Sequence, residues 1–175
     1  MEKPEKHQSG STSIRKLLYA AELLTQAYQV KLETLMTMPL FLERMLFASR
    51  ERALSERLTV IGTDVYHHVQ RLHQLLLRFG GHPGEDLNPC VRPEPSDPIA
   101  AAYFQEELFC QIAAELLAVL KGWADSDLHR RAEAQLTMLI SESKAHLAVI
   151  DESCTQTERR YRDVVLERFR VTALP

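Results

Sequence analysis

The feature that most constrains the fold is a long row of apolar residues with alternating steps of three and four. A helix of 3.6 residues per turn brings such positions onto one face, and the pattern is typical of a helix that packs inside a bundle. The row consists of Ile14, Leu17, Ala21, Leu24, Tyr28, Lys31, Leu35, Met38, Leu42 and Met45. It predicts a first helix that begins near Ser11 to Ser13 and ends near Ser49, with a kink or a break at Pro39.

The same reasoning predicts that the rest of the chain is also helical. Further helices are expected over about residues 54–79, 98–124 and 126–152, and a shorter amphipathic helix is expected after residue 154. Asp97 and Pro98 have the residue types that cap and open a helix. Thr155 and Glu158 have the spacing of a capping box. The expected fold is therefore an all-α four-helix bundle with a short C-terminal helix.

The connection between the second and third helices is long and proline-rich, and it covers residues 82–97. Such a connection can reach roughly 50 Å when extended, whereas a helix of the length of residues 54–79 is about 40 Å long. It can therefore cross the whole bundle, so that the second and third helices run parallel, as in ferritin-like bundles. The alternative is a loop that joins two antiparallel neighbours.

The chain of 175 residues has the length of one domain. We expect a disordered tail at residues 1–11, a ferritin-like bundle at residues 12–153, and a C-terminal helix packed on it at residues 154–175.

The net charge of −3 argues against nucleic acid as a partner. No apolar stretch is long enough for a membrane span, and residues 1–10 do not resemble a secretory signal. A cytoplasmic location is expected, with Cys90, Cys110 and Cys154 as reduced thiols.

Two acid–histidine pairs are the strongest candidates for metal chemistry. Asp64 and His68 are four residues apart in the second helix, and Glu142 and His146 have the same spacing in the fourth. A metal centre inside a bundle needs carboxylates and histidines that project inward from several helices. The alternative is structural, with a core His68 hydrogen-bonded to Asp64 and a half-exposed pair of Glu142 and His146. In the third helix, Glu106 and Glu115 flank the apolar face.

Several segments resemble one family. They are HVQRLHQLLLRFGGHP at residues 68–83, Tyr28 with Pro39, QIAAELL at residues 111–117 and ESKAHL at residues 142–147. Their order and spacing are similar to the YciE/YciF-type branch of the ferritin-like superfamily, whose members are small bacterial proteins associated with stress responses. The resemblance implies a ferritin-like bundle and, in the family, a metal centre at its middle.

The chain departs from the family at the metal-binding positions. The resemblance places four ligand positions of the family on Lys31, Ile61, Leu108 and Gln111, and only Asp64 and Glu142 remain acidic. Two acids are too few for a conventional di-iron centre. The family's ferroxidase or oxygenase chemistry is therefore not expected here.

Lys31 interrupts the apolar row of the first helix. We expect its ammonium to be buried at mid-bundle, where it would take the place of the lost metal and pair with Asp64, Glu142 or both. The alternative is that the long side chain carries the ammonium past the row into solvent.

The leading functional hypothesis is a non-enzymatic, stress-associated ferritin-like protein that acts as a homo-oligomer or through a protein partner, with no cofactor. The competing hypothesis is an oxidoreductase-type metalloprotein that binds iron or manganese through Asp64, His68, Glu142 and His146. A third hypothesis is a helical adaptor or immunity protein unrelated to ferritins, whose fold would need no crossover.

Overall fold

The computed structural model describes residues 8–48, 52–81, 97–121 and 127–173. Within these ranges the chain forms five helices and no strand. They are α1 (Gln8–Ala48), α2 (Arg52–Arg78), α3 (Pro98–Lys121), α4 (Asp127–Ser153) and α5 (Gln156–Ala173). The prediction of an all-α bundle of four long helices with a short C-terminal helix is confirmed.

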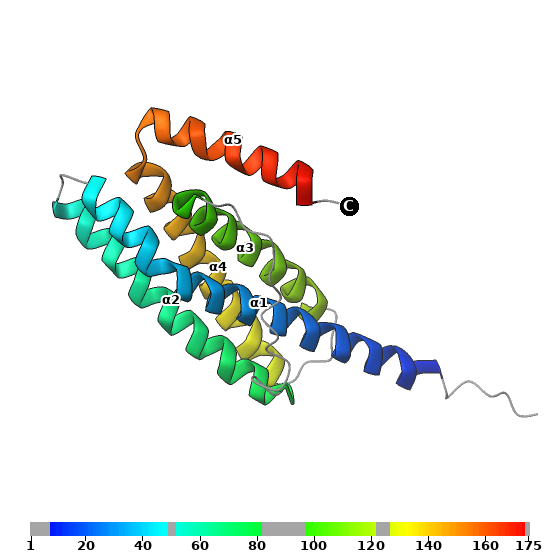
Figure 1. The fold of residues 1–175 in the computed structure, drawn as a ribbon. Coiled ribbons are helices and arrows are strands. Elements are labelled where there is room, and N and C mark those ends of the chain that lie inside the picture. Colours follow the sequence, from blue (N-terminus) through cyan, green and yellow to red (C-terminus); the bar gives the residue numbers. More distant parts are fainter. Residues whose placement is uncertain (1–7, 49–51, 82–96, 122–126, 174–175) are drawn as a thin grey trace, which may run out of the picture.

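The four long helices pack so that α1 and α4 each contact both α2 and α3 (Figure 1). Contacts between side chains give the helix directions. Along α1, Tyr19 and Thr37 bond Glu115 and Gln105 of α3, so α1 and α3 are antiparallel.

Tyr28 of α1 meets His73 of α2, while Met38 lies beside Gly62, so α1 and α2 are antiparallel as well. It follows that α2 and α3 run in the same direction, which is the direction expected from the length of the connection between them. Residues 82–96, where a crossover is expected, lie outside the described residues.

Helix α1 is continuous through Pro39 and begins at Gln8, earlier than the expected start at Ser11 to Ser13. The break considered from the sequence does not occur. Pro39 is exposed, so the carbonyl group that loses its usual N–H partner lies on the solvent side, where water can bond it.

The core consists of two apolar clusters. One cluster contains Leu24, Leu72, Phe109 and Leu136, and the other contains Met38, Leu58, Ile99 and Ile150, each with further neighbours. Between them lie fully buried polar side chains, among them Lys31, His68, Glu106 and Ser143. Each long helix thus contributes a polar residue to the middle of the bundle, and these residues form what we call the polar layer.

The observed buried face of α3 agrees only in part with the apolar face expected from the sequence, which was Leu108, Phe109, Ile112, Leu116, Val119, Leu120 and Trp123 (the last lies outside the described residues). The observed face follows Ile99, Ala102, Glu106, Phe109, Ala113, Leu116 and Leu120, whereas Leu108 and Val119 are only partly buried. The alanines allow the backbone of α3 to come close to its neighbours and leave little side chain to mark the face in the sequence. Because the observed face, and not the expected one, points into the bundle, Glu106 lies in the polar layer.

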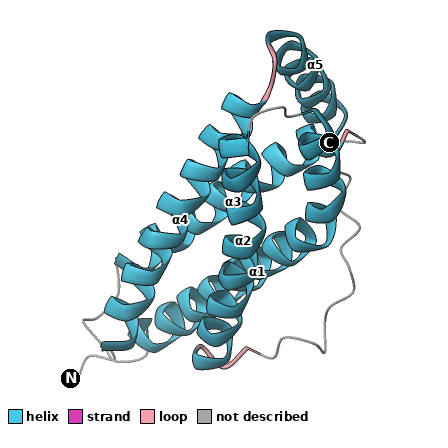
Figure 2. Ribbon diagram, turned by 90° about the vertical axis from the view of Figure 1, so that its left-hand side faces the viewer, coloured by secondary structure: helices cyan, strands magenta, loops and turns pink. Residues whose placement is uncertain are grey.

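Helix α5 begins with the capping box expected from the sequence. Thr155 donates to the Glu158 carboxylate from its backbone N–H (2.7 Å) and its hydroxyl (2.8 Å), and Glu158 N–H donates back to Thr155 Oγ1. The helix lies outside the four-helix bundle, against α3 (Figure 2). There Arg162 lies over the Tyr103 ring and bonds Asp151 at the end of α4.

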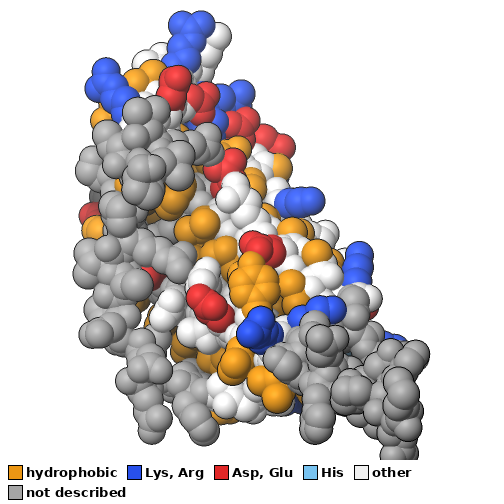
Figure 3. Space-filling model, turned by 90° about the vertical axis from the view of Figure 1, so that its right-hand side faces the viewer, with side chains coloured by type: hydrophobic (Ala, Val, Ile, Leu, Met, Phe, Trp, Pro, Cys, Tyr) orange, Lys and Arg blue, Asp and Glu red, His pale blue; other side chains and the backbone are white. Residues whose placement is uncertain are grey.

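Charged side chains of both signs gather around α5, at the top of the face shown in Figure 3. Hydrophobic side chains lie below and between them on this face. Among the described helices, none combines the length and the apolar character that a membrane span requires.

Candidate functional site

The polar layer is centred on Lys31 of α1, whose side chain has no exposed surface. Its Nζ donates to Glu106 Oε2 of α3 at 2.6 Å and to Ser143 Oγ of α4 at 2.8 Å. Its ammonium also lies 4.3 Å from the centre of the Phe109 ring, where the face of an aromatic ring attracts a cation. A carboxylate, a hydroxyl and an aromatic face thus surround this buried charge.

Glu106, the partner of Lys31, is also fully buried. Burial by itself would raise the pKa of the Glu106 carboxyl. The charge of Lys31 and hydrogen bonds from His146 and Lys31 outweigh burial and hold this pKa at about 2. Burial lowers the pKa of Lys31, and the attraction of Glu106 opposes that effect. At neutral pH Glu106 is therefore ionised.

His146 of α4 connects this ion pair to the bundle surface. Its Nδ1 lies 3.5 Å from Glu106 Oε1, and its Nε2 lies 3.3 Å from Asp64 Oδ2 of α2. Both contacts are long for hydrogen bonds. A neutral imidazole has one N–H, so it can donate to only one of these two carboxylates.

His68 of α2 forms a second path from the layer to the surface. Its Nε2 lies 2.8 Å from Glu142 Oε2, and Arg71 bonds the same oxygen at 3.3 Å. Burial and the charge of Lys31 lower the pKa of His68 to about 3, so its ring is neutral at pH 7. A neutral ring that donates to Glu142 from Nε2 has a bare lone pair at Nδ1, which is buried and has no partner within the described part of the chain.

The structure brings together the four predicted metal ligands but pairs them differently from the sequence expectation. The structural alternative expected a bond between His68 and Asp64 within the second helix, and a half-exposed pair of Glu142 and His146 within the fourth. The observed contacts cross from α2 to α4, between Asp64 and His146 and between His68 and Glu142. The two histidine rings stack with centroids 5.4 Å apart and planes 19° apart.

This arrangement does not fit a metal ion. Histidine binds a metal through a lone pair in the plane of its ring, and the planes of His68 and His146 are nearly parallel, so their lone pairs do not converge. Within the described residues, no three His, Cys, Asp or Glu side chains are grouped so that they could hold an ion. The ammonium of Lys31 already supplies the positive charge that Glu106 requires.

The expected partner of Lys31 was wrong. We expected Asp64 or Glu142, but the lysine pairs with Glu106 because α3 packs directly against α1. Gln111, which the resemblance placed at a ligand position, is exposed. Glu106 lies four residues after Ala102, three before Phe109 and seven before Ala113, so it has the spacing of the buried face of α3. The small side chains of the alanines kept this face from being recognised in the sequence.

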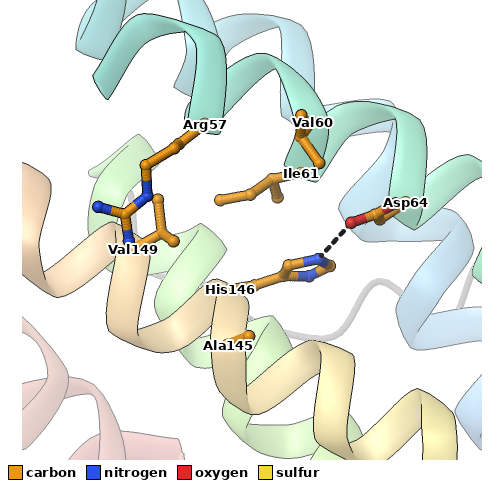
Figure 4. A pocket seen from close by; sticks show the side chains of 7 residues that line it. All are labelled: Arg57, Val60, Ile61, Asp64, Ala145, His146 and Val149. Carbon is orange, nitrogen blue, oxygen red and sulfur yellow. Dashed lines mark hydrogen bonds and ion pairs between the residues drawn. The ribbon is translucent and has the colours of Figure 1, made fainter. Parts of the chain in front are cut away.

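A cavity of about 220 Å³ lies between α2 and α4 (Figure 4). Its walls include Val60 and Ile61 of α2 and Val149 of α4. Asp64 and His146 point toward each other at one end (Figure 4). Because His146 also contacts Glu106, the cavity ends one side chain away from the buried ion pair.

Comparison with known proteins gives no family for this chain. No family model, no curated protein and no solved structure matches it. The resemblance to YciE/YciF-type proteins therefore remains a prediction from the sequence.

Replacement of Lys31 tests the buried ion pair. Lys31→Met leaves the Glu106 carboxylate buried without its cation, so we expect the free energy of unfolding to fall by about 3 kcal/mol. Adding Glu106→Gln removes the stranded charge and should recover most of this loss. Denaturant titrations measure both, with Lys16→Met, at an exposed position of α1, as the control. A single Lys31→Met variant as stable as the wild type would contradict the buried pair.

The pH dependence of stability tests the buried, neutral state of His68. Its pKa is about 3 in the folded protein and about 6.5 in the unfolded chain. As the pH falls below 6.5, the unfolded chain therefore takes up a proton that folded His68 does not, and stability decreases. Between pH 7 and pH 5 this loss is about 2 kcal/mol.

The neighbouring His67 is exposed and provides the matched control. His68→Gln should remove this part of the pH dependence, and His67→Gln should leave it unchanged in denaturant titrations at the two pH values. Equal pH dependence in both variants would show that His68 is not held neutral.

Proposed function

We propose that this chain is a non-enzymatic, ferritin-like bundle in which a buried ion pair takes the place of a metal centre. It acts by self-association or by binding another protein, in the stress-associated role that the resemblance implies. The observation that carries the proposal is the complete burial of Lys31 against Glu106 and Ser143 at the middle of the bundle. A cation fixed in the chain at this point repels the metal ion that a ferritin-like bundle would hold there.

The helix directions support the ferritin-like part of the proposal. Antiparallel contacts between α1 and α2 and between α1 and α3 make α2 parallel to α3. A bundle with one long crossover has this arrangement. An up-and-down bundle of the kind considered for an unrelated adaptor does not.

The surface of α1 supports the association part of the proposal. Met36 is 74% exposed and Leu40, one turn further along the same face, is 61% exposed. Nearer the start of the helix, Leu18 is 65% exposed. Large apolar side chains grouped on one helix face commonly mark a protein contact. We therefore place the contact between copies on the outer face of α1.

The alternative is an iron or manganese protein with a remodelled site of Asp64, His68, Glu142 and His146. The contacts of His68 with Glu142 and of His146 with Asp64 bring these four side chains to one region between α2 and α4, which is the observation in its favour. For this site to form, the two histidine rings would have to leave their stacked arrangement and exchange their carboxylate bonds for metal bonds.

Metal content and association state together test the proposal. Protein purified without chelator or affinity metal should contain well under one iron or manganese per chain by elemental analysis. It should also sediment as an oligomer, which Met36→Glu with Leu40→Glu should dissociate by placing charge in the contact. Leu77→Glu, at an exposed apolar position of α2, is the control and should leave the oligomer intact.

Two results would contradict this account separately. About two equivalents of metal that resist dialysis would make the chain a metalloprotein. Sedimentation of the wild-type protein as a monomer at every concentration would exclude self-association through α1.

A further inference from the structure

The cavity between α2 and α4 combines an apolar body with a polar end. Val60, Ile61, Ala145 and Val149 line most of it, and Asp64 and His146 lie at one end (Figure 4). Ile61 is buried and His146 is only 4% exposed, so this end reaches into the bundle core. Asp64 is partly exposed, so the cavity also communicates with solvent.

The opposite end of the cavity is held by an ion pair. Arg57 of α2 bonds Glu152 of α4 at 2.6 Å, and Figure 4 shows Arg57 extending toward Val149. Two charged contacts, one at each end, thus bridge α2 and α4 across an apolar gap. The Arg57 guanidinium, which also lines the cavity, is thus paired with a carboxylate of α4.

No lysine or arginine of the described residues forms an ion pair with the Asp64 carboxylate. Glu106 pairs with Lys31, and Glu142 pairs with Arg71. Within the same ranges, the one ion-pair partner of Asp64 is His146. The polar end of the cavity therefore favours a cation over an anion.

The contacts of His146 add to the preference of this end of the cavity for a cation. One tautomer of the ring donates Nε2–H to Asp64, and the other donates Nδ1–H to Glu106 and presents the Nε2 lone pair to Asp64. In the second tautomer two hydrogen-bond acceptors face each other 3.3 Å apart. A primary ammonium has three N–H donors and can bond both the carboxylate and the imidazole nitrogen.

We propose that this cavity binds a small primary amine with an apolar body, whose ammonium contacts Asp64 and His146 and whose hydrocarbon part lies among Val60, Ile61, Ala145 and Val149. The cavity of about 220 Å³ limits the size of the ligand. An apolar cavity of about 150 Å³ holds benzene in another protein, so one ring or a short alkyl chain fits here. The site does not depend on the association state of the chain.

Benzylamine is a suitable probe because it joins one ring to one ammonium. In titrations followed by methyl NMR at neutral pH, it should shift the signals of Val60, Ile61 and Val149 with a Kd on the order of 1 mM or below. Benzyl alcohol, which has the same shape without the charge, should bind at least tenfold more weakly. Benzoate should bind more weakly still, because its carboxylate meets Asp64.

Two variants and one control connect binding to the cavity. Asp64→Asn removes the charge at a partly exposed position and should weaken benzylamine binding at least tenfold. Ala145→Phe should block the cavity from its exposed wall. Asp127→Asn removes an exposed carboxylate at the start of α4 and should leave binding unchanged, and thermal melts of all three confirm folding.

Three outcomes would overturn the proposal. They are an absence of methyl shifts with benzylamine, equal binding of benzyl alcohol, and unchanged benzylamine binding by folded Asp64→Asn. The second outcome would indicate an unspecific apolar cavity, and the third would place the amine on another carboxylate.

Discussion

The ion pair between Lys31 and Glu106 is the contact on which the rest of the interior depends. Lys31 lies on the buried face of α1 and Glu106 on the buried face of α3, at positions where apolar residues would be expected. Both side chains are removed from water. The cost of taking two charges out of water is several kcal/mol per ion, so each is tolerated only because the other lies 2.6 Å away. Ser143 and Phe109 complete the surroundings of the ammonium.

A buried ion pair is weak evidence for high stability, because an apolar pair of similar volume is often as stable. The clearer effect of this ion pair is on the position of α3 along α1. If α3 slid by one turn along α1, Lys31 and Glu106 would each lie buried against apolar residues without a partner. The apolar clusters on either side would tolerate such a shift far better. We infer that the polar layer fixes how the helices align, and the apolar clusters supply most of the driving force for folding.

Much of the fold could be predicted from the sequence, because regular spacing and capping residues are local signals. The row of α1, the Asp97–Pro98 pair at the start of α3 and the capping box of α5 are examples. The rotation of α3 could not be read in the same way, because its buried face contains Ala102 and Ala113, whose small side chains resemble neither a core nor a surface position. Because the buried face of α3 was predicted incorrectly, Glu106 was not predicted to lie in the core.

The pairing of the polar side chains also could not be predicted from the spacing of residues within one helix. Spacing of four residues correctly indicated that Asp64 and His68 share a face, and likewise Glu142 and His146. It could not show that each histidine would bond the carboxylate of the other helix, because that depends on how α2 and α4 lie against each other. The same cross-pairing leaves the rings of His68 and His146 stacked, an arrangement that no spacing within one helix predicts.

The protonation and solvent protection of Lys31 test the buried ion pair most directly. Proton–nitrogen correlation spectra of lysine side chains can detect a buried ammonium whose protons exchange slowly with water. At neutral pH we expect one protected ammonium signal that disappears in Lys31→Met and shifts in Glu106→Gln. A Lys31 signal that exchanges as fast as those of the exposed lysines, or that has the shift of a neutral amine, would contradict a buried ion pair at the centre of the bundle.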